Sequence, residues 1–194
     1  MLVSDQARIC FIHIHRTGGS SIAELLSSAL PDARQVCFQH DNAKTIAPAD
    51  LERYKGYFKF AFVRNPWERI LSWYALAYQY RLDRETPFVS LDTFIEEYET
   101  VRRKLRFDNS FMFNQFDYLS AGNGGVAVDV VGRFEDYENE LLRILDRCGV
   151  PPREIPRLNA TQHGSVREAY SGKGRALVEA LCRRDIEYWS YRFG

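Results

Sequence analysis

Two short polar segments of the chain have the composition of anion-binding turns. Residues 15–21 read HRTGGSS and combine two adjacent glycines with one fixed positive charge and three hydroxyl side chains. Glycine lets the backbone approach a ligand closely and take a positive φ, and arginine and hydroxyl groups donate hydrogen bonds to phosphate oxygens. This segment favours a nucleotide-phosphate cradle. The alternative is a plain strand–turn–helix connection whose glycines only make the turn.

The elements on either side of this segment are those that a phosphate-binding loop needs. Residues 9–14 are apolar and β-branched, which is typical of a buried strand. Ile22, Leu25 and Leu26 then recur at helical spacing before Pro31. A helix that starts at such a turn directs backbone N–H groups and the positive end of its dipole toward an anion. The segment matches neither the Walker A pattern nor G-x-G-x-x-G, so ATP-type and dinucleotide sites lose their main support.

A second strand–turn–helix unit follows later along the chain. Residues 57–63 predict a strand that ends at Arg64, with Asn65 as N-cap and Pro66 at the first helical position. Open α/β sheets bind ligands at this end of their strands, and a guanidinium suits a phosphate monoester. Ser72 adds a hydroxyl about two turns into the helix. An arginine at a helix start is often only a capping group, but two anion sites on neighbouring strands predict one ligand with phosphates at both ends.

The rest of the 194 residues completes an alternating pattern of strands and helices, with no repeat or linker. We expect one α/β domain over residues 1–194, with a largely parallel sheet covered by helices. The further predicted elements are helices at 48–54, within 90–118, at 135–148 and at 174–189, and a strand at 128–131.

The composition excludes several classes of protein. Lys plus Arg and Asp plus Glu number 26 each, so the formal net charge is zero, which argues against a nucleic-acid-coating protein. The four cysteines and four histidines show no zinc-type spacing, and we expect reduced core cysteines and no metal. No segment reaches the roughly 18 to 20 apolar residues of a membrane span, and the first residues do not form a signal peptide. These features predict a cytoplasmic protein.

Both polar segments resemble motifs of one enzyme family. Residues 11–21, FIHIHRTGGSS, resemble the 5′-phosphosulfate loop of the sulfotransferases that use 3′-phosphoadenosine-5′-phosphosulfate (PAPS). Residues 60–72, FAFVRNPWERILS, resemble their 3′-phosphate motif in the form found in carbohydrate sulfotransferases that include the heparan 2-O enzymes. Residues 131–135 are similar to a later strand-to-helix segment, and 158–161 and 185–193 to the C-terminal region.

The resemblance implies a P-loop-like three-layer α/β sandwich with a central, mostly parallel sheet. It also implies transfer of a sulfuryl group from PAPS to a hydroxyl or amine of a carbohydrate or small-molecule acceptor, with no metal in the transfer step. The oligomeric state is left open. The residues implied for the 5′-phosphosulfate are Arg16, Thr17, Gly18, Gly19, Ser20 and Ser21, and those for the 3′-phosphate are Arg64 and Ser72.

Arg16 stands where the family usually has lysine. Because arginine is not deprotonated in proteins, we assign Arg16 the electrostatic stabilisation of the leaving phosphate rather than acid catalysis. His40 is the expected general base, since histidine titrates near neutral pH and related enzymes often carry a histidine in this place. A surface-loop histidine is the alternative, and Asp41 and Glu68 are weaker candidates for the base.

Two other functions compete with sulfuryl transfer. A nucleotide-dependent kinase or phosphotransferase would need magnesium ligands and a Walker lysine, and the sequence shows neither pattern. A non-catalytic nucleotide-binding module would fit the exchange of lysine for Arg16. For the acceptor, the basic residues 102–106 and the aromatic residues of 111–118 are candidates, although a solvated helix face explains the first better, and core packing explains most of the second better.

Overall fold

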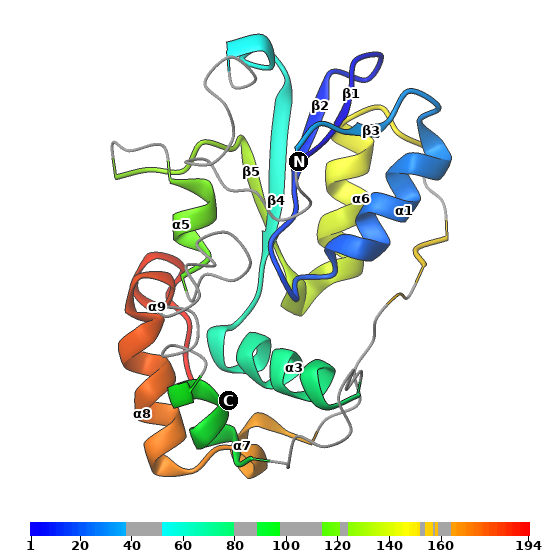
Figure 1. The fold of residues 1–194 in the computed structure, drawn as a ribbon. Coiled ribbons are helices and arrows are strands. Elements are labelled where there is room, and N and C mark those ends of the chain that lie inside the picture. Colours follow the sequence, from blue (N-terminus) through cyan, green and yellow to red (C-terminus); the bar gives the residue numbers. More distant parts are fainter. Residues whose placement is uncertain are drawn as a thin grey trace. The chain divides into compact units, whose positions relative to one another are not determined.

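The computed structural model of the chain forms two compact units (Figure 1). Met1–Arg64 and Asn109–Asn159 make up the first, called here the sheet unit, and Asn65–Asp108 and Ala160–Gly194 make up the second, called the helical unit. The division falls between Arg64 and Asn65, so residues 60–72, the predicted 3′-phosphate motif, contribute a strand to the sheet unit and a helix to the helical unit. The single domain over 1–194 stays a prediction. The structure describes residues 1–37, 52–79, 89–97, 114–120, 124–151, 154–156, 158 and 164–194.

A five-stranded sheet in the order β3-β1-β2-β4-β5 forms the centre of the sheet unit. The parallel strands β2, β4 and β5 are in register, with Phe11 opposite Phe60 and Phe60 opposite Val130. Only β1 runs against the other four strands, because it pairs antiparallel with both β2 and β3. The predicted α/β fold with a mostly parallel sheet is therefore confirmed. The strands are β1 (Leu2–Ser4), β2 (Ile9–Ile12), β3 (Arg34–Gln35), β4 (Phe58–Val63) and β5 (Val130–Arg133).

One face of this sheet is covered by α1 (Gly19–Ala29) and α6 (Tyr137–Arg147), which lie side by side in Figure 1. Successive side chains of a strand point to opposite faces, and this face receives Phe11, Phe60 and Phe62. Each buried side chain of this size stabilises the fold by roughly 1.5–3 kcal/mol, so a one-residue slip of β2 or β4 would be strongly unfavourable. The helices contribute Ile22, Leu25, Leu26, Leu141, Ile144 and Leu145 to this core.

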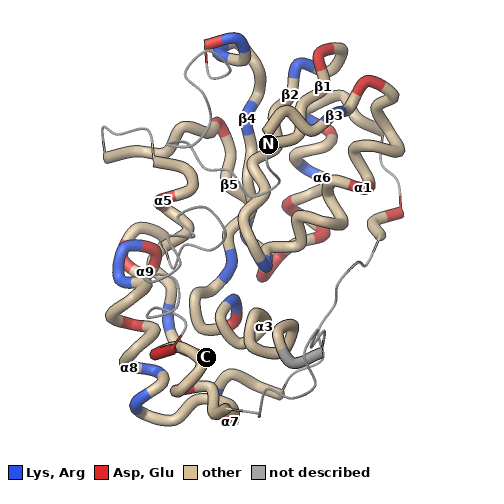
Figure 2. Tube along the Cα trace, viewed as in Figure 1, with Lys and Arg blue, Asp and Glu red and all other residues tan. Residues whose placement is uncertain are grey.

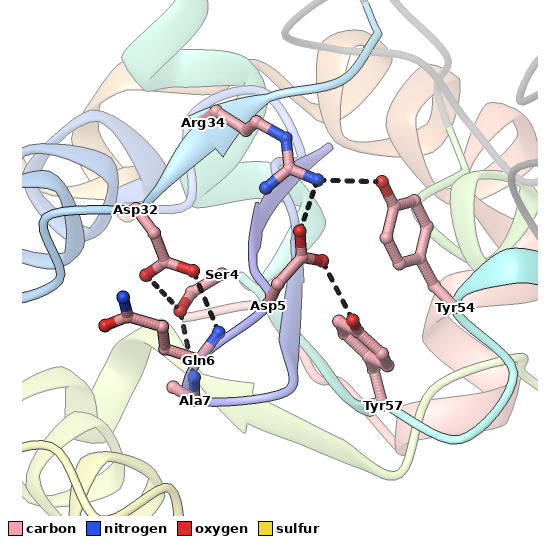
Figure 3. Close-up of polar contacts among 8 residues, drawn as sticks. All are labelled: Ser4, Asp5, Gln6, Ala7, Asp32, Arg34, Tyr54 and Tyr57. Atoms are coloured by element: carbon pink, nitrogen blue, oxygen red, sulfur yellow. Dashed lines mark hydrogen bonds and ion pairs between the residues drawn. The ribbon is translucent and has the colours of Figure 1, made fainter.

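The turn between β1 and β2 is fixed by a polar network at the amino-terminal edge of the parallel strands (Figure 3). The carboxylate of Asp5 accepts a hydrogen bond from Tyr57 at 2.8 Å and pairs with Arg34 at 2.7 Å. The carboxylate of Asp32 accepts from the Ser4 hydroxyl at 2.7 Å and from the backbone N–H of Gln6 at 2.8 Å. These bonds join the turn to the segments that enter β3 and β4.

The helical unit contains α3 (Pro66–Gln79), a helix over residues 91–97, α7 (Val166–Ala169), α8 (Gly172–Leu181) and α9 (Arg183–Trp189). The prediction of one closing helix over 174–189 is wrong, because the chain turns at Cys182, which ends α8 and precedes α9 with φ −107° and ψ 20°. The segment after α9 packs near the start of α3, where the Phe193 ring lies 5.5 Å from the Trp67 ring. No helix within the described residues is long and apolar enough to cross a membrane. All four cysteines are thiols, as predicted, with Cys10 and Cys182 buried in the core and Cys37 and Cys148 half-buried.

Candidate functional site

The two predicted anion-binding motifs meet at one edge of the sheet unit. Strands β2 and β4 are parallel neighbours, with Ile12 opposite Ala61, so residues 15–21 and Arg64 leave the sheet from the same carboxyl edge. Arg133 ends β5 opposite Val63 at that edge and is exposed. Open α/β sheets bind their ligands outside this end of the strands.

The backbone of the turn after β2 alternates in the sign of φ. Arg16 has φ 64° and Gly18 has φ 78°, while Thr17 between them is not among the residues with positive φ. Alternation of this kind turns successive N–H groups toward one side and forms an anion-binding concavity. A positive φ is uncommon for arginine and costs roughly 1–2 kcal/mol, and strained residues of this kind cluster at ligand sites.

Two of the predicted side-chain donors of this turn bond to the protein itself. The hydroxyl of Thr17 is buried and donates to the carbonyl of Ile14 at 2.9 Å, which closes the turn. The hydroxyl of Ser21 accepts from the backbone N–H of Leu158 at 3.0 Å, while Ser20 is half-buried. In the structure Thr17 and Ser21 hold the turn in place, and their contact with a ligand stays a prediction.

Both glycines of the turn are packed too closely for a side chain. A Cβ atom on Gly19 would overlap the imidazole of His13, which is buried and stacked on Phe11 with 5.7 Å between ring centroids. A Cβ atom on Gly18 would lie 2.6 Å from Cε2 of Tyr137 and 3.0 Å from Cε2 of Phe134. The turn therefore lies directly on His13, which follows β2, and on side chains of the segment that opens α6.

Phe134 and Tyr137 connect this turn to Arg64. The guanidinium of Arg64 lies over the Phe134 ring, 4.4 Å from its centroid, and the two aromatic rings are 5.3 Å apart. The phenol of Tyr137 donates to the carbonyl of Gly18 at 2.9 Å, and burial raises the pKa of Tyr137, which keeps the donor protonated. The two motifs are therefore joined by direct packing within one unit.

The backbone of Arg64 has a partner that the sequence did not indicate. The side-chain amide of Gln115 accepts from the N–H of Arg64 and donates to its carbonyl, both at 2.8 Å. Gln115 is fully buried and directly precedes the short helix α5 (Phe116–Leu119). Sequence reasoning missed Gln115 and Tyr137, and it included Phe134 only as part of residues 131–135.

The charges around the helix starts also differ in a way that favours an anion at the turn. Helix α1 has no acidic residue in its first turn and no side-chain cap. Helix α6, in contrast, has Glu138 and Glu140 in its first turn and follows the exposed Glu135 and Asp136 (Figure 2). Carboxylates stabilise the amino end of a helix by about 0.3–1 kcal/mol. The amino end of α1 lacks this internal compensation and suits an external anion.

The remaining predicted residues lie elsewhere. In the helical unit, Asn65 caps α3, since its side chain accepts from the N–H of Trp67 at 3.1 Å, and Pro66 is the first helical residue, as predicted. Ser72 is fully buried on α3, so its pairing with Arg64 stays a prediction. Glu68 is half-buried in the first turn of the same helix. His40, Asp41, Arg102–Arg106, Phe111 and Phe113 lie outside the described residues.

Comparison with known proteins identifies the family of the chain. A protein-family model described as "Sulfotransferase family" matches residues 1–191. The chain belongs to the sulfotransferase family. Like other members, it is therefore assigned to sulfuryl transfer in general terms, and the predicted membership of a sulfotransferase family is confirmed.

A relative of this sulfotransferase-family chain is an uncharacterized protein of Archaeoglobus fulgidus. The two are 28% identical over 116 residues, which is 59% of this chain and 87% of the relative. No solved structure gives a significant match. The described part of this family member holds no group of three His, Cys, Asp or Glu side chains that could bind a metal ion.

Proposed function

We propose that the chain is a PAPS-dependent sulfotransferase that transfers the sulfuryl group to a hydroxyl or amine of a carbohydrate or small-molecule acceptor. The observation that carries this proposal lies at the carboxyl edge of the sheet, where Gly18 packs on Phe134 and Tyr137 and the guanidinium of Arg64 lies over the same Phe134 ring. Two anion-binding features that lie so close together suit one nucleotide with anionic groups on the 5′ and 3′ positions of its ribose.

The residues present fit such a donor. The turn offers backbone N–H groups at the start of α1, and the positive φ of Arg16 and Gly18 turns successive N–H groups toward one side, as an anion site requires. Arg64 offers a planar fork of donors that matches a phosphate monoester. The bound donor would supply an activated sulfuryl group on a phosphate leaving group.

In this proposal each residue of the chain has a separate task. The positive charge of Arg16 stabilises the negative charge that develops on the leaving phosphate. Arg64 fixes the 3′ end of the nucleotide, which aligns the other end for in-line attack by the acceptor. His40 removes the proton of the acceptor hydroxyl, for which a side chain that titrates near neutral pH is well matched.

Calorimetric titration with 3′,5′-adenosine bisphosphate and with ATP tests the nucleotide assignment. We expect tighter binding of the bisphosphate, and tighter binding of ATP would instead favour a kinase or other phosphotransferase. Arg64→Ala should weaken bisphosphate binding strongly. Arg147→Ala is a matched control, because that guanidinium also lies over a ring, 4.7 Å from the Phe58 centroid at the opposite end of β4, and its loss should leave binding unchanged.

Transfer of label from PAPS into a mixed pool of carbohydrate and small-molecule acceptors tests the reaction itself. A protein that binds the bisphosphate tightly but transfers no label to any acceptor would be a non-catalytic nucleotide-binding module. The neutral net charge of the chain gives no support for a long polyanionic acceptor, so short glycan ends and small metabolites belong in the pool. The cytoplasmic location stays a prediction.

A further inference from the structure

We propose that Gln115 is a positioning residue for the 3′-phosphate, acting through the backbone of Arg64. This inference rests on the proposed function, since it assigns Arg64 to the 3′ end of the nucleotide. Gln115 itself would not touch the nucleotide. It would hold Arg64 so that the guanidinium stays over Phe134 and is already in place when the ligand arrives.

Gln115 continues the hydrogen bonding of β4 one residue beyond the sheet. The ladder between β4 and β5 ends with Val63 opposite Arg133, so Arg64 is the first residue after the paired strand. A side-chain amide carries one carbonyl and one N–H group in nearly the geometry of a peptide bond. The two 2.8 Å bonds between the Gln115 amide and the N–H and carbonyl of Arg64 therefore give Arg64 the paired donor and acceptor that a neighbouring strand would provide.

The element that carries Gln115 also contacts the other anion-binding motif. Gln115 accepts a backbone bond from Tyr118 at 3.1 Å, and the buried Tyr118 ring meets the His15 ring edge-on with 6.4 Å between centroids. His15 opens the turn that contains Arg16 and Gly18. One short segment of the sheet unit thus contacts both the turn and Arg64, and it helps to set the spacing between the two anion-binding positions.

Both ends of Arg64 are therefore fixed before any ligand binds. Its backbone is bonded to a fully buried amide, and its guanidinium lies on the ring of Phe134. A free arginine side chain loses much conformational entropy when it is immobilised by a ligand. A prearranged arginine loses less conformational entropy on binding, so its affinity for the ligand is higher. The effect should be confined to nucleotides that carry the 3′-phosphate.

Titration of two nucleotides that differ only in the 3′-phosphate tests this role. The variant Gln115→Met keeps the length of the side chain and removes both amide groups. We expect its affinity for 3′,5′-adenosine bisphosphate to fall by about tenfold, with the affinity for 5′-AMP unchanged. In the double variant with Arg64→Ala, the Gln115→Met change should cause no further loss, because the group that it positions is absent.

Gln35→Met is the matched control. Its amide also bonds a backbone carbonyl, that of Cys37 at 2.8 Å, but it lies exposed on β3, so binding of both nucleotides should be unchanged. If Gln115→Met does not fold, as judged by its thermal unfolding, Gln115→Leu gives the same reading, since it is also uncharged and lacks both amide groups.

The outcomes separate this inference from the function on which it rests. A parent protein that binds the bisphosphate no better than 5′-AMP refutes the 3′-phosphate assignment and this inference together. A parent protein with the expected preference, kept in full by the Gln115 variants, refutes the positioning role alone. An equal loss of affinity for both nucleotides also refutes the positioning role, because that result would indicate a general structural role.

Discussion

Gly18→Ala should destabilise the protein more than the same substitution at another glycine of equal backbone conformation. Gly18 has φ 78°, and its added methyl group would lie 2.6 Å from Cε2 of Tyr137 and 3.0 Å from Cε2 of Phe134. Gly149, which follows α6, has φ 67°, and nothing lies within 4 Å of the position of its Cβ atom. The two sites share the backbone penalty and differ in the packing around the added atom.

The expected magnitudes follow from that difference. Alanine with a left-handed φ costs roughly 1–2 kcal/mol, which is the whole expected effect of Gly149→Ala. At Gly18 the methyl group must also displace the Tyr137 ring, which is held by its bond to the Gly18 carbonyl and by the Phe62 ring at 5.3 Å. Overpacking of this kind adds about 1–3 kcal/mol, so the total for Gly18→Ala is roughly 2–5 kcal/mol.

Urea unfolding of the parent protein and both variants measures these costs, provided that the slope of free energy against urea is unchanged. Gly18→Ala should also weaken binding of 3′,5′-adenosine bisphosphate, because the Phe134 ring that the methyl group disturbs supports Arg64, while Gly149→Ala should bind normally. Equal destabilisation by the two substitutions would refute the reasoning. It would mean that Tyr137 and Phe134 move aside freely and do not hold the turn.

Three further outcomes can be measured. The pKa of Asp32 lies below its ordinary value of 3.8, chiefly because the Gln6 N–H and then the Ser4 hydroxyl bond the carboxylate. The contribution of Asp32 to stability is therefore present above pH 3.8 and is lost as pH falls through the lowered pKa. Urea unfolding should show that Asp32→Asn loses less stability in acid than the parent protein does. His40→Ala should leave bisphosphate binding intact in calorimetry and lower the rate of label transfer from PAPS by about 10²–10⁴-fold, whereas an unchanged rate would remove His40 as the base. Arg16→Gly should raise the free energy of unfolding by about 1 kcal/mol by relieving the positive φ. It should also lower the rate of label transfer from PAPS. A variant that is more stable and equally active would contradict the role of Arg16.

Local chemistry explains what could be predicted from the sequence. The apolar runs at 9–14 and 57–63 became β2 and β4, and the capping chemistry of Asn65 and Pro66 fixed the start of α3. Such signals depend only on residues within a few positions of one another. The placement of both turns at the carboxyl edge of the sheet could be predicted too, because two strand–turn–helix units of the same hand bring their turns together.

Contacts between distant residues could not be predicted in the same way. Gln115 bonds the backbone of a residue 51 positions away, and Tyr137 bonds the carbonyl of a residue 119 positions away. Neither residue type indicates its partner. The strands β1 and β3 contain only three and two residues, too few for a periodic pattern. The break between α8 and α9 falls at Cys182, where the apolar spacing continues although the backbone turns.

The support around Arg16 explains how the turn keeps an unfavourable backbone conformation. A residue with positive φ persists only where its surroundings hold it more strongly than the strain opposes it. Each of the three residues that follow Arg16 is held by a contact: Thr17 by its bond to the Ile14 carbonyl, Gly18 by Tyr137, and Gly19 by packing on His13. Because a positive φ strains lysine as much as arginine, the exchange in this chain changes the chemistry of the side chain and leaves the backbone cost unchanged. In the proposed reaction, the permanent charge of Arg16 would limit the residue to electrostatic stabilisation and would leave proton transfer to another group.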